Sequence, residues 1–244
     1  KSLSPLRSRL AAYSLRDSLP DTRRDPKAIG RIDLLGFIDY AATLGIDAVE
    51  LTSYYMPMPL TAEYIKLLKR RTHLNGLDIS GGAIGNNFSH APNSDMGKEQ
   101  MAYVRYWIDQ YAMLGAPVIR IFGGKPERNA DEKQAVENII ANVTTACEYA
   151  GQKGVMLAIE NHDYLVEIDR FLKVVKAIDS PWFGVNFDSG NLAPTNDPYG
   201  ELERIAPYAV SAQIKTTIMV GEEEQPADFL RIVQILRKSN YQGY

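Results

Sequence analysis

The chain repeats one unit seven times: a short apolar run followed by a longer segment with helical spacing of its apolar residues. Apolar runs bounded by turn residues predict buried strands, and apolar residues three and four positions apart predict amphipathic helices. The predicted strands are 9–15, 47–51, 76–82, 117–122, 155–160, 183–188 and 208–214. The predicted helices are 33–44, 61–73, 95–114, 130–152, 166–178, 198–206 and 227–238.

This alternation predicts parallel strands joined by right-handed helical crossovers. Eight such units close a (β/α)8 TIM barrel in about 250 residues, and this chain has 244. An open doubly wound sheet is disfavoured because no phosphate-binding fingerprint follows the first strand. We therefore expect one α/β domain over 1–244, a TIM barrel whose eighth strand is truncated or lies beyond Tyr244, with 241–244 approaching it.

The composition narrows the classes of partner. A formal net charge of −3 without a basic run argues against a nucleic-acid partner. No apolar stretch approaches the ~20 residues of a membrane span, so no membrane partner is expected. Cys147 is the only cysteine, which excludes a disulfide framework. A cytoplasmic location is favoured, with export possible if a signal peptide precedes Lys1, and a homo-oligomer remains possible.

Polar side chains follow most of the predicted strands, most clearly at Glu160-Asn161-His162, directly after a run of four apolar residues. In a barrel these strand ends meet at one mouth, where active sites lie. The candidates there are Glu50, Arg120, Glu160, His162, Asn186, Asp188, Asn191, Gln213 and Lys215. Carboxylate and amide oxygens with one nitrogen suit a divalent ion such as Mn, Mg, Co or Zn.

Each candidate also has an ordinary interpretation. Glu50 alone could be a salt-bridge partner, and Lys215 a solvated lysine. Residues 188–191 could be a simple turn capped by Asp188. The aromatic residues of the loops, including Tyr54, could be packing residues. The functional interpretation depends on one fold bringing all of these groups to one place.

Five short motifs, in order along the chain, resemble the xylose isomerase-like TIM barrel superfamily in its sugar phosphate isomerase/epimerase branch. They are 48–51, 114–120, 160–162, 186–191 and 213–215. The resemblance implies one divalent metal held by side chains of strands five to eight. It assigns Glu160 and Asp188 as ligands, with Gln213 where relatives have His, and no counterpart to the eighth-strand Glu up to Tyr244. Asn191 stands where many relatives have His.

The resemblance implies proton abstraction next to a sugar carbonyl and a metal-stabilised enediolate. Glu160 is the expected base and ligand, and Lys215 and His162 the expected partners in catalysis. Expected contacts to a small sugar substrate are Glu50, Tyr54, Arg120, Asn186 and Asn191, and Tyr55 and Trp182 could also face the sugar ring. A metal-dependent lyase or hydrolase of 3-keto sugars or glycosides, and a non-catalytic sugar-binding barrel, are the alternatives.

Overall fold

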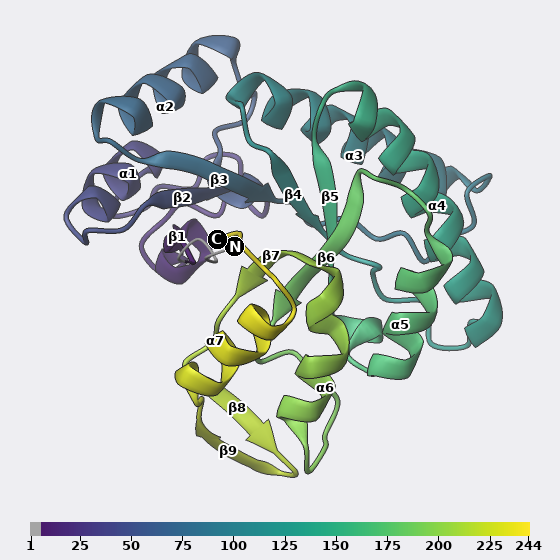
Figure 1. Cartoon of the computed structure of the whole chain (residues 1–244). Coiled ribbons are helices and arrows are strands. Elements are labelled where there is room, and N and C mark those ends of the chain that lie inside the picture. Colours follow the sequence, from purple (N-terminus) through teal and green to yellow (C-terminus); the bar gives the residue numbers. More distant parts are fainter. Residues whose placement is uncertain (1–5) are drawn as a thin grey trace.

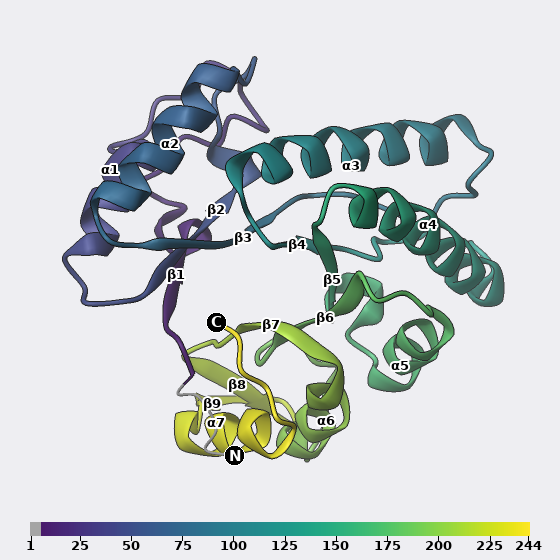
Figure 2. The same ribbon diagram turned by 45° about the horizontal axis from the view of Figure 1, so that its top comes forward.

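A computed structural model describes residues 6–244. Seven parallel strands form one sheet in sequence order and curl into an open barrel with the helices outside (Figures 1 and 2). The strands are β1 (Arg9–Ala11), β2 (Ala48–Thr52), β3 (Asp78–Ala83), β4 (Val118–Ile121), β5 (Met156–Glu160), β6 (Phe183–Asp188) and β7 (Ala209–Gln213). The helices are α1 (Leu34–Ala42), α2 (Ala62–Leu74), α3 (Asp95–Leu114), α4 (Glu132–Gln152), α5 (Ile168–Ala177), α6 (Pro198–Ile205) and α7 (Phe229–Lys238). The predicted α/β barrel architecture is confirmed.

Every one of these helices begins at a side chain that accepts a hydrogen bond from a backbone N–H of the first turn. The capping residues are Asp33, Thr61, Ser94, Asp131, Glu167, Asp197 and Asp228. Such caps satisfy N–H groups that have no partner within the helix and typically contribute about 1 kcal/mol each. They fix where each crossover helix starts after the loop that carries the strand-end residues.

The gap between β7 and β1 is bridged by the last residues and by one arginine. The Gly243 carbonyl accepts a hydrogen bond from Arg7 N at 3.4 Å, and the Tyr244 carbonyl accepts one from Ala212 N at 3.1 Å. The Arg9 guanidinium of β1 reaches Ser211 Oγ of β7 at 2.7 Å. Residues 243–244 therefore lie between the two edge strands, where the eighth strand was expected.

Tyr111 of α3 shows how tightly the helices pack on the sheet. Its buried hydroxyl donates to the Leu51 carbonyl at 2.6 Å. A Cβ atom added at Gly82 of β3 would lie 2.0 Å from the Tyr111 ring. Gly82 is therefore needed for close approach of the helix to the strand.

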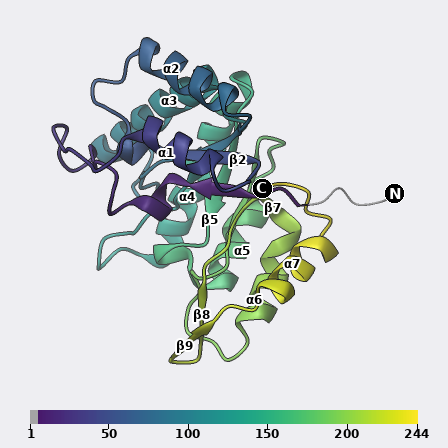
Figure 3. The ribbon, with the colours of Figure 1, turned by 90° about the vertical axis from the view of Figure 1, so that its left-hand side faces the viewer.

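A hairpin of β8 (Thr217–Val220) and β9 (Glu223–Pro226), which was not predicted, is inserted between β7 and α7. It turns at Gly221, which has a positive φ of 60°. The hairpin projects away from the barrel, beyond α6 and α7 (Figures 1 and 3).

Candidate active site

The register of three neighbouring strands places the polar residues side by side. Glu160 at the end of β5 lies opposite Asn186 of β6, and Asp188 lies opposite Gln213 of β7. After their first residue, β5 and β6 are buried throughout, whereas β7 is buried only at Ser211 and Ala212. The register confirms that the three strand ends meet.

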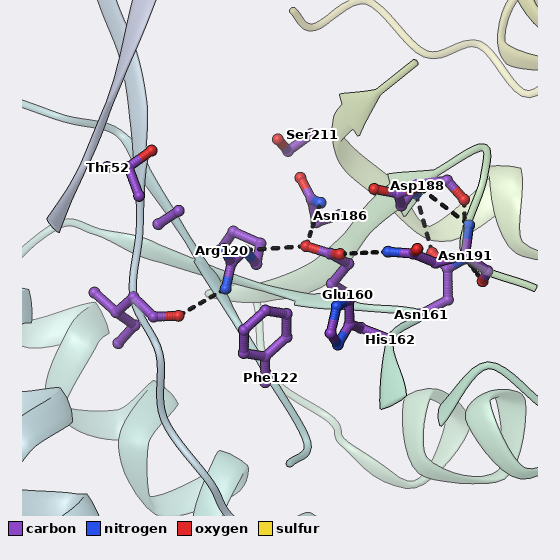
Figure 4. A network of polar contacts seen from close by, with 12 residues as sticks. Thr52, Arg120, Phe122, Glu160, Asn161, His162, Asn186, Asp188, Asn191 and Ser211 are labelled. Atoms are coloured by element: carbon purple, nitrogen blue, oxygen red, sulfur yellow. Dashed lines mark hydrogen bonds and ion pairs between the residues drawn. The ribbon is translucent and has the colours of Figure 1, made fainter. Parts of the chain in front are cut away.

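Glu160 is held from two sides (Figure 4). Arg120 Nε lies 3.0 Å from its Oε2 atom, and Asn191 Nδ2 donates to its Oε1 atom at 2.9 Å. Asn186 Nδ2 donates to Oε2 at 3.3 Å. Burial raises the pKa of the Glu160 carboxyl to about 7, although Arg120 opposes the rise. A carboxyl group with such a pKa can exchange protons near neutral pH.

Asp188 is fully buried and is oriented by backbone N–H groups. Its Oδ1 accepts from Gly190 N at 2.9 Å and from Asn191 N at 3.2 Å. Its Oδ2 forms an ion pair with Lys215, whose Nζ lies 2.9 Å away. Burial disfavours the charge on Lys215, but Asp188 outweighs it and raises the lysine pKa above its usual value. Lys215 is therefore a cation at neutral pH.

Asn161 connects these groups, although its sequence position alone assigned it no role. Its fully buried amide donates to the Asp188 carbonyl at 2.9 Å and to the Asn191 carbonyl at 2.6 Å. Its oxygen accepts from Asp188 N at 3.0 Å. The residue between Glu160 and His162 thus fixes the turn that carries Asp188 and Asn191 (Figure 4).

Glu160 borders a cavity of about 370 Å³ at the barrel mouth. Most predicted site residues line it: Glu50, Tyr54, Arg120, Glu160, His162, Asn191, Gln213 and Lys215. Asn186 and Asp188 are buried and do not line the cavity. Asn186 instead bonds to the Glu160 carboxylate, and Asp188 to the backbone N–H of Asn191. Arg23, Phe122 and Asp163 also line the cavity and were not predicted. Asp163 has a positive φ of 49°, a strained backbone that commonly marks functional sites.

Two residues that were expected to contact the sugar, Glu50 and Arg120, bond to other protein groups instead. Glu50 pairs with Arg9 at 3.3 Å. The Arg120 guanidinium donates to the Ile84 carbonyl at 2.7 Å, besides pairing with Glu160, so it positions that carboxylate. Trp182 precedes β6 and packs against Gly151 of α4, at the end of the barrel opposite the cavity, so it cannot contact a sugar there.

The cavity wall contains a stack of rings and cations. His162 lies against the Phe122 ring with centroids 4.4 Å apart, and the Arg120 guanidinium lies 3.9 Å from the same ring centroid. Arg120 also donates to Tyr54 Oη at 3.3 Å. Aromatic faces beside polar groups suit a ligand with both apolar and hydroxylated surfaces, such as a sugar.

The donor atoms for a metal are oxygens. Within residues 6–244, no group of three or more His, Cys, Asp and Glu side chains is arranged to hold a metal ion. Gln213, an oxygen donor outside that set, lies opposite Asp188. The Oδ1 atom of Asn186 is buried without a hydrogen-bond partner among the described residues, whereas the Oδ2 atom of Asp188 pairs with Lys215. The oxygen atoms of two carboxylates, Glu160 and Asp188, and of one amide, Gln213, are of the kind that a hard divalent ion prefers.

The fold is that of a TIM-type barrel, and its carboxylates and amides lie at the carboxyl ends of the strands, where TIM barrels have their active sites. The chain belongs to the xylose isomerase-like TIM barrel family, whose model matches residues 38–244.

One curated relative is named "Putative L-ribulose-5-phosphate 3-epimerase SgbU" and comes from Haemophilus influenzae. It is 27% identical over 150 residues, which are 56% of this chain and 52% of the relative. The match thus spans about half the length of that relative.

Solved structures share the fold at low identity. A xylose isomerase-like TIM barrel protein from Mycobacterium smegmatis in complex with magnesium has a TM-score of 0.72 and 17% identity, covering 99% of this chain and 88% of that one. An L-ribulose 3-epimerase has a TM-score of 0.72 and 14% identity, and the match covers 98% of this chain and 80% of that one. The 3-keto-D-glucoside 4-epimerase YcjR of E. coli has a TM-score of 0.71 and 13% identity, and the match covers 87% of this chain and 85% of that one.

In the part of the chain that the structure describes, no helix is long and apolar enough to cross a membrane.

Proposed function

We propose that this chain is a divalent-metal-dependent sugar isomerase or epimerase that removes a proton from a carbon next to a carbonyl. The observation that carries the proposal is the pair of buried carboxylates, Glu160 and Asp188, on neighbouring strands, of which Glu160 lines the 370 Å³ cavity. The relatives named as sugar epimerases support the same class of reaction.

Glu160, Asp188 and Gln213 would hold the metal. When bound, a divalent ion supplies Lewis acidity for the negative charge that develops on the substrate oxygens. Because the donors are oxygens, Mg or Mn suits the site better than Zn, which prefers nitrogen and sulfur.

The protein side chains supply proton transfer and orientation. Glu160 takes the proton, because it is the carboxylate of the pair that lines the cavity where the substrate would bind. Lys215 remains charged beside Asp188 and donates hydrogen bonds to substrate oxygens. His162, held against Phe122, and Asn191, held by its bond to Glu160, contact the hydroxyl groups of the sugar.

The test is exchange of carbon-bound hydrogen in deuterated water, because it detects proton abstraction before any product is identified. A panel of ketoses is incubated with protein and Mg²⁺ or Mn²⁺ and followed by proton NMR. We expect a chelator to stop the exchange and either metal to restore it. Glu160→Gln should slow it by at least about 100-fold, the lower limit for losing general base catalysis.

The matched control is Glu148→Gln, an exposed glutamate of α4 that should leave the exchange rate unchanged. Circular dichroism of both variants checks folding, since Arg120 loses its carboxylate partner in Glu160→Gln. Exchange that persists at the wild-type rate in a folded Glu160→Gln protein would rule out this base.

A further inference from the structure

Arg23, in the loop after β1, is a cation at the cavity that does not lie at the end of a strand. It lines the cavity, and its guanidinium carbon lies 4.0 Å from the centroid of the Tyr54 ring. The same tyrosine accepts a hydrogen bond from Arg120, which in turn pairs with Glu160. Arg23 is therefore one aromatic ring away from the ion pair that holds the proposed base.

The neighbouring residue anchors Arg23 in this position. Thr22 is buried, and its N–H donates to the Tyr54 carbonyl at 2.9 Å. Its hydroxyl lies 2.9 Å from that carbonyl and 2.5 Å from the carbonyl of Met56, as a hydrogen-bond donor to both. Because the backbone and the ring both hold Arg23, binding a ligand there costs little ordering entropy.

The charge of Arg23 is poorly compensated. Its carboxylate partner, Asp21, is 3.4 Å away, and the same Asp21 oxygen also pairs with Arg24 at 3.3 Å. By contrast, Arg120 and Lys215 lie 3.0 and 2.9 Å from buried carboxylates of their own.

The whole loop has the opposite charge to the chain. Residues 16–31 contain five basic and three acidic side chains, a net charge of +2, whereas the chain carries −3. The basic residues are Arg16, Arg23, Arg24, Lys27 and Arg31, and the acidic ones are Asp17, Asp21 and Asp25. A local positive excess beside a cavity attracts anionic ligands.

We propose that Arg23 binds a phosphate or carboxylate group of the substrate, so that the site selects an anionic keto sugar over its neutral counterpart. The inference rests on the proposed function and adds the substrate class to it. The planar guanidinium suits both groups, since each can accept two parallel N–H bonds. With the anion at Arg23, the rest of the sugar extends past Tyr54 toward Glu160.

The experiment uses two matched pairs of sugars with the metal-loaded protein. D-Ribulose 5-phosphate against D-ribulose tests phosphate, and D-fructuronate against D-fructose tests carboxylate. Calorimetry measures affinity, and proton exchange measures turnover. The variants are Arg23→Gln and, as control, Arg24→Gln, whose side chain is 79% exposed, shares Asp21 and does not line the cavity.

We expect wild-type protein to prefer the anionic sugar of one pair by at least about tenfold, and that pair identifies the anion. Arg23→Gln should lower the affinity for the anionic sugar by about 10- to 100-fold. It should change the affinity for the neutral sugar by less than about threefold. Arg24→Gln should leave both affinities within about threefold. Arg23→Lys keeps the charge without the fork and should recover part of the loss.

Equal wild-type affinity for both members of each pair, or equal losses for both in Arg23→Gln, would overturn the inference. The two proposals fail differently. Arg23-dependent binding without proton exchange would refute the isomerase or epimerase function and keep the anion site. A rate of proton exchange on neutral ketoses that is unchanged in Arg23→Gln, with no preference for anionic sugars, would support the isomerase or epimerase function and refute the anion site.

Discussion

Asn161→Ala tests whether the amide between Glu160 and His162 supports the fold as well as the site. The substitution removes hydrogen bonds of 2.9, 2.6 and 3.0 Å to the backbone of Asp188 and Asn191, all made by a fully buried side chain. A buried backbone group left without a partner costs about 1–3 kcal/mol. Since such losses are not additive, we expect the free energy of unfolding to fall by about 3 kcal/mol, measured by urea denaturation.

Two variants control this experiment. Asn93→Ala removes an exposed asparagine amide and should change the unfolding free energy by less than about 0.5 kcal/mol. Asn161→Asp keeps the shape and the acceptor oxygen, but an oxygen replaces the donor that faces two carbonyls. It should be at least as unstable as Asn161→Ala. A loss below about 1 kcal/mol for either Asn161 variant would refute the assigned role.

Two further predictions concern packing and charge. Arg120→Met leaves Glu160 buried without its cation and should lower the unfolding free energy of metal-free protein by about 3–5 kcal/mol. Urea titrations should show a larger loss well above pH 7, where Glu160 is ionised, than well below it, where the carboxyl of pKa about 7 binds a proton. Gly82→Ala should cost about 3 kcal/mol, because the new Cβ would lie 2.0 Å from the Tyr111 ring. Adding Tyr111→Ala should remove the clash, so the double variant should lose less than the sum of the single ones.

The barrel was predictable because several of its strands are largely buried and therefore nearly continuous in apolar residues, as in 156–159. The ends of the strands and helices were less predictable than the elements themselves. The first strand ends at Ala11 and continues as a 3-10 turn, whereas the sequence predicted strand to residue 15. The fifth helix starts at Ile168 because Glu167 caps it, two residues after the predicted start.

The β8–β9 hairpin escaped prediction because its second strand, Glu223–Pro226, is polar, exposed and ends in proline. For the candidate site, the strand-end residues were predictable because one fold delivers them to one mouth. Arg23 and Phe122 were not, since tertiary contacts hold them: Thr22 binds the Tyr54 segment, and Phe122 packs between Arg120 and His162. Local sequence carries no signal for such contacts.

The hairpin forms a second pocket beside the candidate active site. It starts two residues after Lys215, and its own residues, among them Ile218 and Glu224, form with Asn191 and Lys215 a side pocket of about 220 Å³. Its strands pair only with each other among the described residues, so β7 and α7 do not depend on it for backbone pairing. Changes in the hairpin can therefore reshape this side pocket, which shares Asn191 and Lys215 with the 370 Å³ cavity, without breaking the strand pairing that positions Glu160 and Asp188.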